Sequence, residues 1–474
     1  MNKRISFLVL SAILVGIVAA GCSSSDPTPP PEPTARFRVV HASPDLGAVD
    51  IYLDASLTAW LEDVAYGDAT TYNSGTTRTV TLVFRAAGSE PTSVPLYASG
   101  PIVLNAGDSV TALVAGLIAV NEADMFRLMV YRDNFQNTPQ ATARTVHAGS
   151  DAPNVRVTLG ATDQVLADDL ARWEDSGRGG VVYETGVEHD VVVTAAGGIT
   201  SFRAPELAPA ASYYFILTGL ITGQGAQTTP FHLLIVGPGG VEELEPLAPR
   251  DFRLVHAVPD GGPVDAYMVE GLGDGMTRVD MDINMAFGDA SAYGRASIRQ
   301  VIIEFYDLSA NPDQVDPLFT QSVHIHDTAG ATTAFAAGLA DSDDPADMVR
   351  VFSLPDDFPV PEAGMTAARL VHAVPNLGSL RVDFGDDGSL EATLDRFGGN
   401  AEGAISLTAD TGLTMVVREG SGIAGLFTTP AMAADRDHYL VLTGIANGVP
   451  DFSLLTLTQE GSLGFTMQDL IEGQ

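Results

Sequence analysis

The sequence predicts an all-β chain that folds as four tandem β-sandwich modules of roughly a hundred residues each. Three observations support this prediction. With 474 residues, the chain is too long for a single hydrophobic core. A short motif around a histidine recurs four times along the chain. Between these motifs, apolar and polar residues alternate with a period of two and are separated by turn residues, as in strands with one buried face.

The amino-terminal segment, residues 1–21, is typical of a lipoprotein signal peptide. Two basic residues open it, an apolar run follows over residues 5–18, and the sequence Ala-Ala-Gly-Cys ending at Cys22 resembles a lipobox. Ala19 departs from the leucine that is usual at the first of these four positions. Cleavage would leave Cys22, the sole cysteine, as a lipid-bearing amino terminus. The alternative is an uncleaved membrane helix, for which the apolar run is at the short limit.

A flexible tether follows the signal, because residues 22–34 are rich in serine and proline. Ser23 directly after the cysteine resembles the sorting pattern of lipoproteins that reach the outer membrane. We therefore expect an exported protein that is lipid-anchored in the outer membrane or on the cell surface.

Self-comparison of the remaining sequence defines the four modules. Each opens with an arginine, a His-Ala pair and a turn that carries Asp or Asn, and the histidines are 106, 109 and 116 residues apart. The expected modules are residues 35–140, 141–249, 250–364 and 365–474. The signature pairs are His41 and Asp45, His147 and Asp151, His256 and Asp260, and His372 and Asn376.

Within each module the pattern is that of short strands. Val49, Ile51 and Leu53 alternate with polar residues, and turn sequences such as Ser43-Pro44-Asp45 separate such runs. About seven strands per hundred residues indicate a two-sheet sandwich of the immunoglobulin or transthyretin kind. We expect each module to close its own core, so that the four follow one another like beads.

The module openings resemble a known family. The pattern Arg-x-x-His-Ala-x-Pro-Asp, followed by a Val-Asp-x-Tyr strand, is similar to the bacterial domain of unknown function 4397. The strand starting at Val49 and the one starting at Val264 match it, whereas Arg156 and Arg381 replace the aspartate in the other two copies. The resemblance extends over nearly all of residues 35–474. It implies tandem β-sandwiches in an exported or surface-anchored protein, and it implies no activity or catalytic residue.

The four signature histidines allow two interpretations. Each could be a metal ligand or general base, or each could be a partly buried imidazole that fixes the turn by hydrogen bonds. A zinc site needs three or four converging ligands, and no second His or Cys recurs in all four modules. A residue that recurs in every diverging copy is more typical of a contact that defines the fold, so we favour the structural interpretation.

The third module contains the remaining candidates for a metal site. His324 and His326 would share one face of a strand, so both imidazoles could bind one ion. Calcium prefers several oxygen ligands on a flexible loop, which two acidic segments could offer. These are the segment 274–280 and the loop with Asp341, Asp343, Asp344 and Asp347. Neither has EF-hand spacing, so we predict no cofactor and keep calcium as an open alternative.

Composition and absent motifs limit the possible functions. The chain has 24 Lys and Arg against 60 Asp and Glu, a net charge of −36 that disfavours nucleic-acid binding. Catalytic signatures such as Gly-x-Ser-x-Gly or His-Glu-x-x-His are absent. We therefore expect a non-enzymatic adhesion, binding or scaffold protein for an extracellular or envelope protein or a glycan. The alternatives are a hydrolase or metal-dependent enzyme with its site in the third module, and a purely structural spacer.

Overall fold

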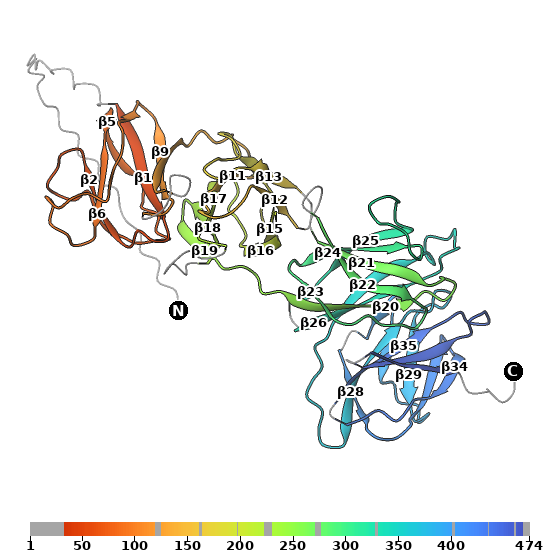
Figure 1. Ribbon diagram of the computed structural model, residues 1–474. Helices are drawn as coiled ribbons and strands as arrows, with labels where there is room; N and C mark the ends of the chain where they lie inside the picture. The colour runs from red at the N-terminus through yellow and green to blue at the C-terminus, as the bar shows by residue number, and fades with distance from the viewer. Residues whose placement is uncertain are drawn as a thin grey trace, which may run out of the picture.

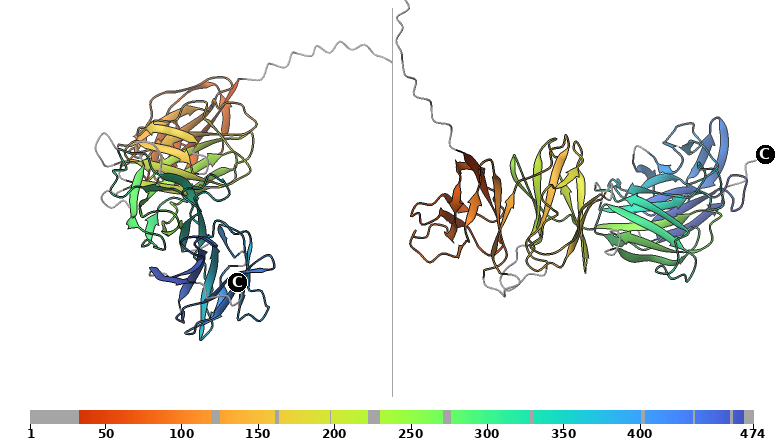
Figure 2. Two further views of the ribbon diagram at one scale, coloured as in Figure 1. Left: turned by 90° about the vertical axis from the view of Figure 1, so that its right-hand side faces the viewer. Right: turned by 90° about the horizontal axis from the view of Figure 1, so that it is seen from above.

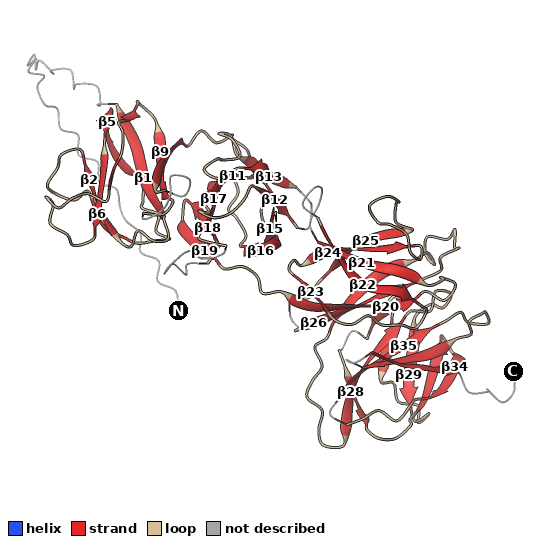
Figure 3. Cartoon of the chain, in the orientation of Figure 1, coloured by secondary structure: helices blue, strands red, loops and turns tan. Residues whose placement is uncertain are grey.

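The protein is an all-β chain of sandwiches, which confirms the predicted fold class (Figures 1 and 3). A computed structural model describes residues 33–118, 125–160, 164–196, 198–221, 230–270, 276–327, 330–400, 403–434, 436–458 and 461–467. These residues contain no helix long and apolar enough to cross a membrane. Cys22 and the expected signal peptide lie outside the described residues.

The first sandwich consists of ten strands. They are β1 (Thr34–Ala42), β2 (Val49–Leu53), β3 (Leu61–Val64), β4 (Asn73–Thr76), β5 (Arg78–Val80), β6 (Leu82–Ala86), β7 (Tyr97–Ala98), β8 (Ile102–Leu104), β9 (Ser109–Ala115) and β10 (Arg127–Arg132). One sheet has the order β10-β9-β1-β4 and the facing sheet the order β3-β2-β6-β7, while β5 pairs with β8.

The second sandwich repeats this plan with nine strands. They are β11 (Ala141–His147), β12 (Val155–Leu159), β13 (Val165–Leu170), β14 (Val181–Tyr183), β15 (His189–Ala195), β16 (Gly198–Ala204), β17 (Ser212–Thr218), β18 (His232–Gly237) and β19 (Gly240–Leu244). The two sheets have the orders β14-β11-β17-β18-β19 and β13-β12-β15-β16.

The third sandwich has two four-stranded sheets, β23-β20-β26-β27 and β22-β21-β24-β25. Its strands are β20 (Arg250–Ala257), β21 (Val264–Glu270), β22 (Thr277–Met285), β23 (Gly294–Ala296), β24 (Gln300–Tyr306), β25 (Phe319–His324), β26 (Ala331–Ala337) and β27 (Arg350–Pro355).

The fourth sandwich combines the sheets β31-β28-β35-β36-β37 and β30-β29-β33-β34, and β32 also pairs with β28. Its strands are β28 (Met365–His372), β29 (Leu380–Phe384), β30 (Ala392–Leu394), β31 (Gly398–Gly399), β32 (Ile405–Thr408), β33 (Thr414–Glu419), β34 (Gly422–Thr428), β35 (Asp437–Thr443), β36 (Ser453–Thr458) and β37 (Gly461–Met467).

Each sandwich is centred on the strand that carries the signature histidine. This strand, which is β1, β11, β20 or β28, runs parallel to β9, β17, β26 or β35 respectively. We call the sheet that contains it the histidine sheet and the facing sheet the second sheet. Four separate core clusters fill the spaces between the two sheets of the four sandwiches.

The central strands of the histidine sheets are buried on both faces, which differs from the single buried face that the alternating sequence pattern predicts. In β1, Val39 packs in the core of its own sandwich, whereas Val40 and Ala42 point the opposite way and are also buried. The reason is that a neighbouring module covers the outer face. One apolar cluster joins the histidine sheets of the first and second modules, and another joins those of the third and fourth. The modules are therefore not independent beads but two pairs (Figures 1 and 2).

The two pairs are held by equivalent contacts. In the first pair the hydrogen bonds run from Arg38 Nη1 to Gly237 O at 3.5 Å, from Thr218 Oγ1 to Ala42 O at 2.8 Å, and from the Tyr214 hydroxyl to Asp133 at 2.5 Å. In the second pair they run from Arg253 Nη1 to Thr458 O, from Thr443 Oγ1 to Ala257 O at 3.2 Å, and from the Tyr439 hydroxyl to Asp356 at 2.6 Å. The repeated structural unit is thus a pair of modules.

The junction between the two pairs is different and more polar. Arg203 of the second module forms an ion pair with Asp327 of the third at 2.5 Å, and Ser201 donates a hydrogen bond to Ser297 O at 3.0 Å. Val192 of the second module also packs against the core of the third. The second module therefore uses its histidine sheet toward the first module and its second sheet toward the third.

Candidate functional site

Each signature histidine shares the inward face of its strand and has at most 3% of its surface exposed. Its Nε2 atom faces the carbonyl oxygen six residues further on. These distances are 2.8 Å for His41 and Gly47, 2.8 Å for His147 and Pro153, 3.2 Å for His256 and Gly262, and 2.7 Å for His372 and Gly378. Its Nδ1 atom accepts the backbone N–H two residues further on, at 3.2 to 3.3 Å in all four modules.

These contacts define the protonation state of the imidazoles. Because Nδ1 accepts from a backbone N–H, the ring proton is on Nε2 and is donated to the carbonyl. Burial lowers the pKa of His41, His147 and His256, and it lowers that of His372 to about 4. Both nitrogens of each neutral ring are thus bound to the backbone, and they fix the turn after the strand.

The signature Asp or Asn fixes a second loop. It accepts the backbone N–H two positions after the glycine that follows the parallel partner strand. The donors are Ile118 for Asp45 at 2.9 Å, Ile221 for Asp151 at 2.7 Å, Ala340 for Asp260 at 2.8 Å and Ala446 for Asn376 at 3.0 Å. We call the end of each sandwich that these two loops form its signature end.

The glycine at this place is a structural requirement, as Gly444 of the fourth module shows. Its φ is +89°, and a Cβ atom on it would lie 2.2 Å from the carbonyl oxygen of Asp451. Gly116, Gly219 and Gly338 also have positive φ values, from +86° to +114°, and a Cβ atom on each would lie 1.9 to 2.6 Å from a carbonyl oxygen. In all four modules the next residue forms a parallel bridge to the returning chain, which closes the loop.

A comparison with known protein families finds a match that includes the first module. Residues 35–158 match the family described as Domain of unknown function (DUF4397). The DUF4397 match covers the first module and the opening of the second, so it contains both His41 and His147 with their turns. No curated protein matches the chain. Because the DUF4397 description names no activity, the function has to be inferred from the geometry of the modules.

The aspartate of the DUF4397-like Val-Asp-x-Tyr strand has a clear structural role. The buried Asp50 carboxylate accepts the backbone N–H groups of Asp63 and Gly88, both at 2.9 Å. In the third module the buried Asp265 accepts those of Asn284 and Ser309 at 2.9 and 2.8 Å. These carboxylates therefore stabilise loops of the second sheet.

The expected metal candidates of the third module are distributed over two elements. His324 is the last residue of β25 and His326 follows the strand. Their ring centroids are 5.3 Å apart, and His326 Nε2 is 3.2 Å from Ser353 O. The four aspartates lie on the loop between β26 and β27. There Asp347 forms an ion pair with Arg396 of the fourth module at 2.6 Å, and Asp344 accepts the N–H of Ala346 at 2.9 Å.

Within the described parts of the chain, one group of three side chains is spaced closely enough to hold a metal ion, and it lies in the second module. The buried His232 has Nδ1 3.1 Å from Glu243 Oε1 and Nε2 2.9 Å from Glu245 Oε1. This group contains none of the candidates from the sequence. It depends on the register of β18 against β19, which sequence spacing does not reveal.

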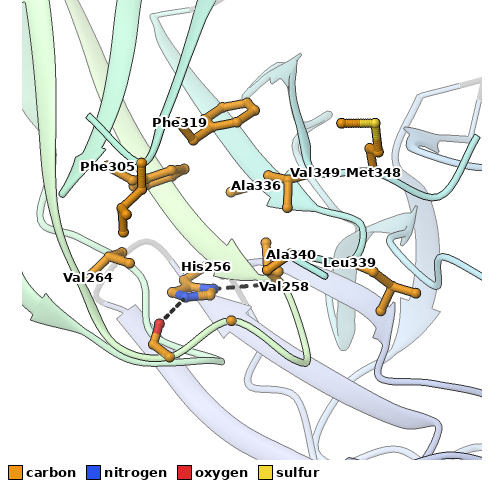
Figure 4. A pocket seen from close by; sticks show the side chains of 13 residues that line it. His256, Val258, Val264, Phe305, Phe319, Ala336, Leu339, Ala340, Met348 and Val349 are labelled. Carbon is orange, nitrogen blue, oxygen red and sulfur yellow. Dashed lines mark hydrogen bonds between the residues drawn. The ribbon is translucent and has the colours of Figure 1, made fainter. Parts of the chain in front are cut away.

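Two cavities lie at signature ends, in the second and third modules. The cavity of the third module has a volume of about 380 Å³, and its walls include His256, Phe305 and Phe319 (Figure 4). The cavity of the second module has about 400 Å³, and Phe231 is among its lining residues. Pockets of this size are typical of small-molecule binding.

Proposed function

We propose that this chain is a non-enzymatic, lipid-anchored scaffold of the cell envelope that binds ligands at the signature ends of its sandwiches. The observation that carries this proposal is the pairing of modules by two equivalent sets of contacts. It is supported by the signature residues themselves, whose polar atoms are bonded to the backbone of the signature loops.

The pair contacts argue for rigid presentation of binding sites. In the first pair, the Arg38 guanidinium lies 4.5 Å from the ring centre of Tyr72 and 5.7 Å from that of Tyr214. In the second pair, Arg253 lies 4.7 Å from Tyr293 and 5.8 Å from Tyr439. Cation–π contacts at buried positions add to the apolar cluster around them. Sites held at fixed spacing lose little freedom on binding and gain avidity together.

The lipid anchor is part of the proposal because the net charge of −36 repels anionic headgroups. Attachment through an acylated Cys22 removes the need for a basic membrane-binding surface. The test is metabolic labelling with an alkyne-bearing fatty acid, followed by membrane fractionation. Wild-type chain should carry label and sediment with the envelope, whereas Cys22→Ser should do neither. Label that persists in Cys22→Ser would overturn the anchor.

The binding role is tested with residues 33–474, which include every described strand and core cluster. Arrays of glycans and envelope proteins should give at least one saturable ligand. Removing the tyrosine acceptors by Asp133→Ala together with Asp356→Ala should loosen both pairs and weaken that binding. The control is Val94→Ala, which changes a side chain that is 89% exposed and should leave binding unaltered.

The alternatives give other results in the same experiment. A purely structural spacer would yield no saturable ligand. A metal-dependent enzyme in the third module would turn over its ligand and would lose this activity when His324 and His326 are both replaced by Ala. Either result would contradict the proposed scaffold.

A further inference from the structure

The cavity of the third module lies at a place where each of the other modules has a phenylalanine ring. In the second module this ring borders a cavity, because Val193 and Thr200 replace the aromatic rings that surround it in the first module. In each module, this position comes directly after the residue of the returning chain that forms the parallel bridge at the signature end. It is occupied by Phe126, Phe231 and Phe452 in the first, second and fourth modules, and all three side chains are at least nine-tenths buried. In the third module the corresponding residue is Val349, which lines the cavity.

The side chains around this position show that the third module lacks an aromatic ring that the first module has. In the first module, Phe126 packs against Tyr97 with ring centres 4.7 Å apart and against Phe84 at 6.1 Å. The strand pairing puts Phe305 and Phe319 of the third module at the positions of Phe84 and Tyr97.

The third module thus keeps two rings of the triplet and lacks the third. Phe305 and Phe319 stack on each other with ring centres 5.7 Å apart and planes inclined by 28°. Both contribute to the cavity wall, and Figure 4 shows them on the same side of it. The apolar space next to them is therefore shaped by the fold to contain an aromatic ring.

The electrostatics of the lining exclude a charged ligand. None of the residues that line the cavity is Asp, Glu, Lys or Arg. The one titratable group, His256, stacks on Phe305 at 6.5 Å, and both of its nitrogens are bonded to the backbone. At the rim, Leu318 and Met348 are 61% and 47% exposed, so a bound apolar molecule would also remove their side chains from water.

We propose that the third module binds a small uncharged aromatic molecule, whose ring takes the place that Phe126 fills in the first module. This proposal rests on the proposed binding function and names its ligand class. The aromatic ring could belong to a free small molecule or to a side chain of a partner protein. We assign it to a free small molecule, because the cavity volume of about 380 Å³ is that of a small-molecule site.

The experiment uses residues 33–474 with 13C-labelled methionine methyl groups, and the probe is indole. Residues 33–474 contain 11 of the chain's 12 methionines, and a Met348→Leu variant assigns the rim residue. Indole should shift the Met348 resonance saturably, with a dissociation constant of about 1 mM or tighter for a ligand of this size. Cyclohexanol, as an aliphatic control, should bind at least about tenfold more weakly, because it lacks the ring faces that stack on Phe305 and Phe319.

The chain itself supplies the matched variants. Val349→Phe introduces the residue that the other three modules contain. Next to Phe305 and Phe319 this ring would complete the aromatic triplet of the first module, so the cavity should be filled, the fold retained and the indole shift lost. Val349→Ala keeps the cavity open and should retain binding. Phe319→Ala, at a partly exposed position, removes one aromatic wall and should weaken binding. It tests the proposal if Val349→Phe does not fold.

Three results would overturn the proposal. They are the absence of a saturable Met348 shift with indole, equal binding of indole by Val349→Phe, and binding of N-acetyltryptophanamide without binding of indole. The last result would identify the ligand as an aromatic side chain of a partner protein. None of them would remove a ligand found on the arrays, so failure here is distinguishable from failure of the scaffold function.

Discussion

Protonation of His372 should weaken the fourth module in mild acid. Burial lowers its pKa from 6.5 to about 4, because the charged imidazole would lose water while both nitrogens face backbone groups. Between these two values the unfolded chain binds more protons than the folded chain, so stability falls as the pH drops through this window. From pH 7 to pH 5, this histidine alone should reduce the free energy of unfolding by about 2 kcal/mol, or roughly twentyfold in the opening equilibrium.

Hydrogen exchange with mass spectrometry can measure this effect locally. His372→Gln has no titrating group at this position. The ratio of protection in the variant to protection in wild type, measured for β28 and β35, should therefore be roughly twentyfold larger at pH 5 than at pH 7. Comparing both proteins at each pH cancels the intrinsic pH dependence of exchange. Peptides of the first module, where both proteins retain His41, provide the control. An unchanged protection ratio at the two pH values would refute the buried neutral state.

Three further predictions concern the signature loops and the pair contacts. Asp260→Asn should be tolerated, because Asn376 has the same role in the fourth module. Asp260→Ala should lower the free energy of unfolding by about 1 kcal/mol. Equal urea midpoints for the two variants would contradict the proposed loop contact. Gly444→Ala should lower the free energy of unfolding in urea by roughly 3 kcal/mol or more. Gly420→Ala should lower it much less, because Gly420 has a positive φ but open space around it. A similar loss in both variants would refute the steric argument. Asp356→Ala should lower the transition temperature of the second pair in calorimetry, because the buried Tyr439 hydroxyl loses its acceptor, and an unaltered transition would show that this contact contributes nothing.

The sandwiches could be predicted from local patterns, because period-two alternation and turn residues act within a few neighbouring residues. The pairing of modules could not, because it depends on what covers the outer face of each histidine sheet. A signal was nevertheless present. Runs such as Val39-Val40 and Leu113-Val114-Ala115 are apolar without alternation, as in strands buried on both faces.

The cavity of the third module could not be predicted from the sequence for a different reason. Val349 corresponds to Phe126, Phe231 and Phe452, but the distance from the preceding glycine differs, because loops of unequal length intervene. Only the bridge that closes each loop places these residues at one position. In the same way, His232 and Glu243 are eleven residues apart and meet through strand register.

The double burial of the histidine sheets has a consequence for how such chains can grow or be cut. A chain that stopped after the third module would expose Val255 and Phe335, which the fourth module now covers. Such an uncovered apolar β-surface invites self-association. Viable gains and losses of length should therefore come in twos. A protease acting near Leu247, between the second and third modules, should release two halves that each keep their histidine sheets covered.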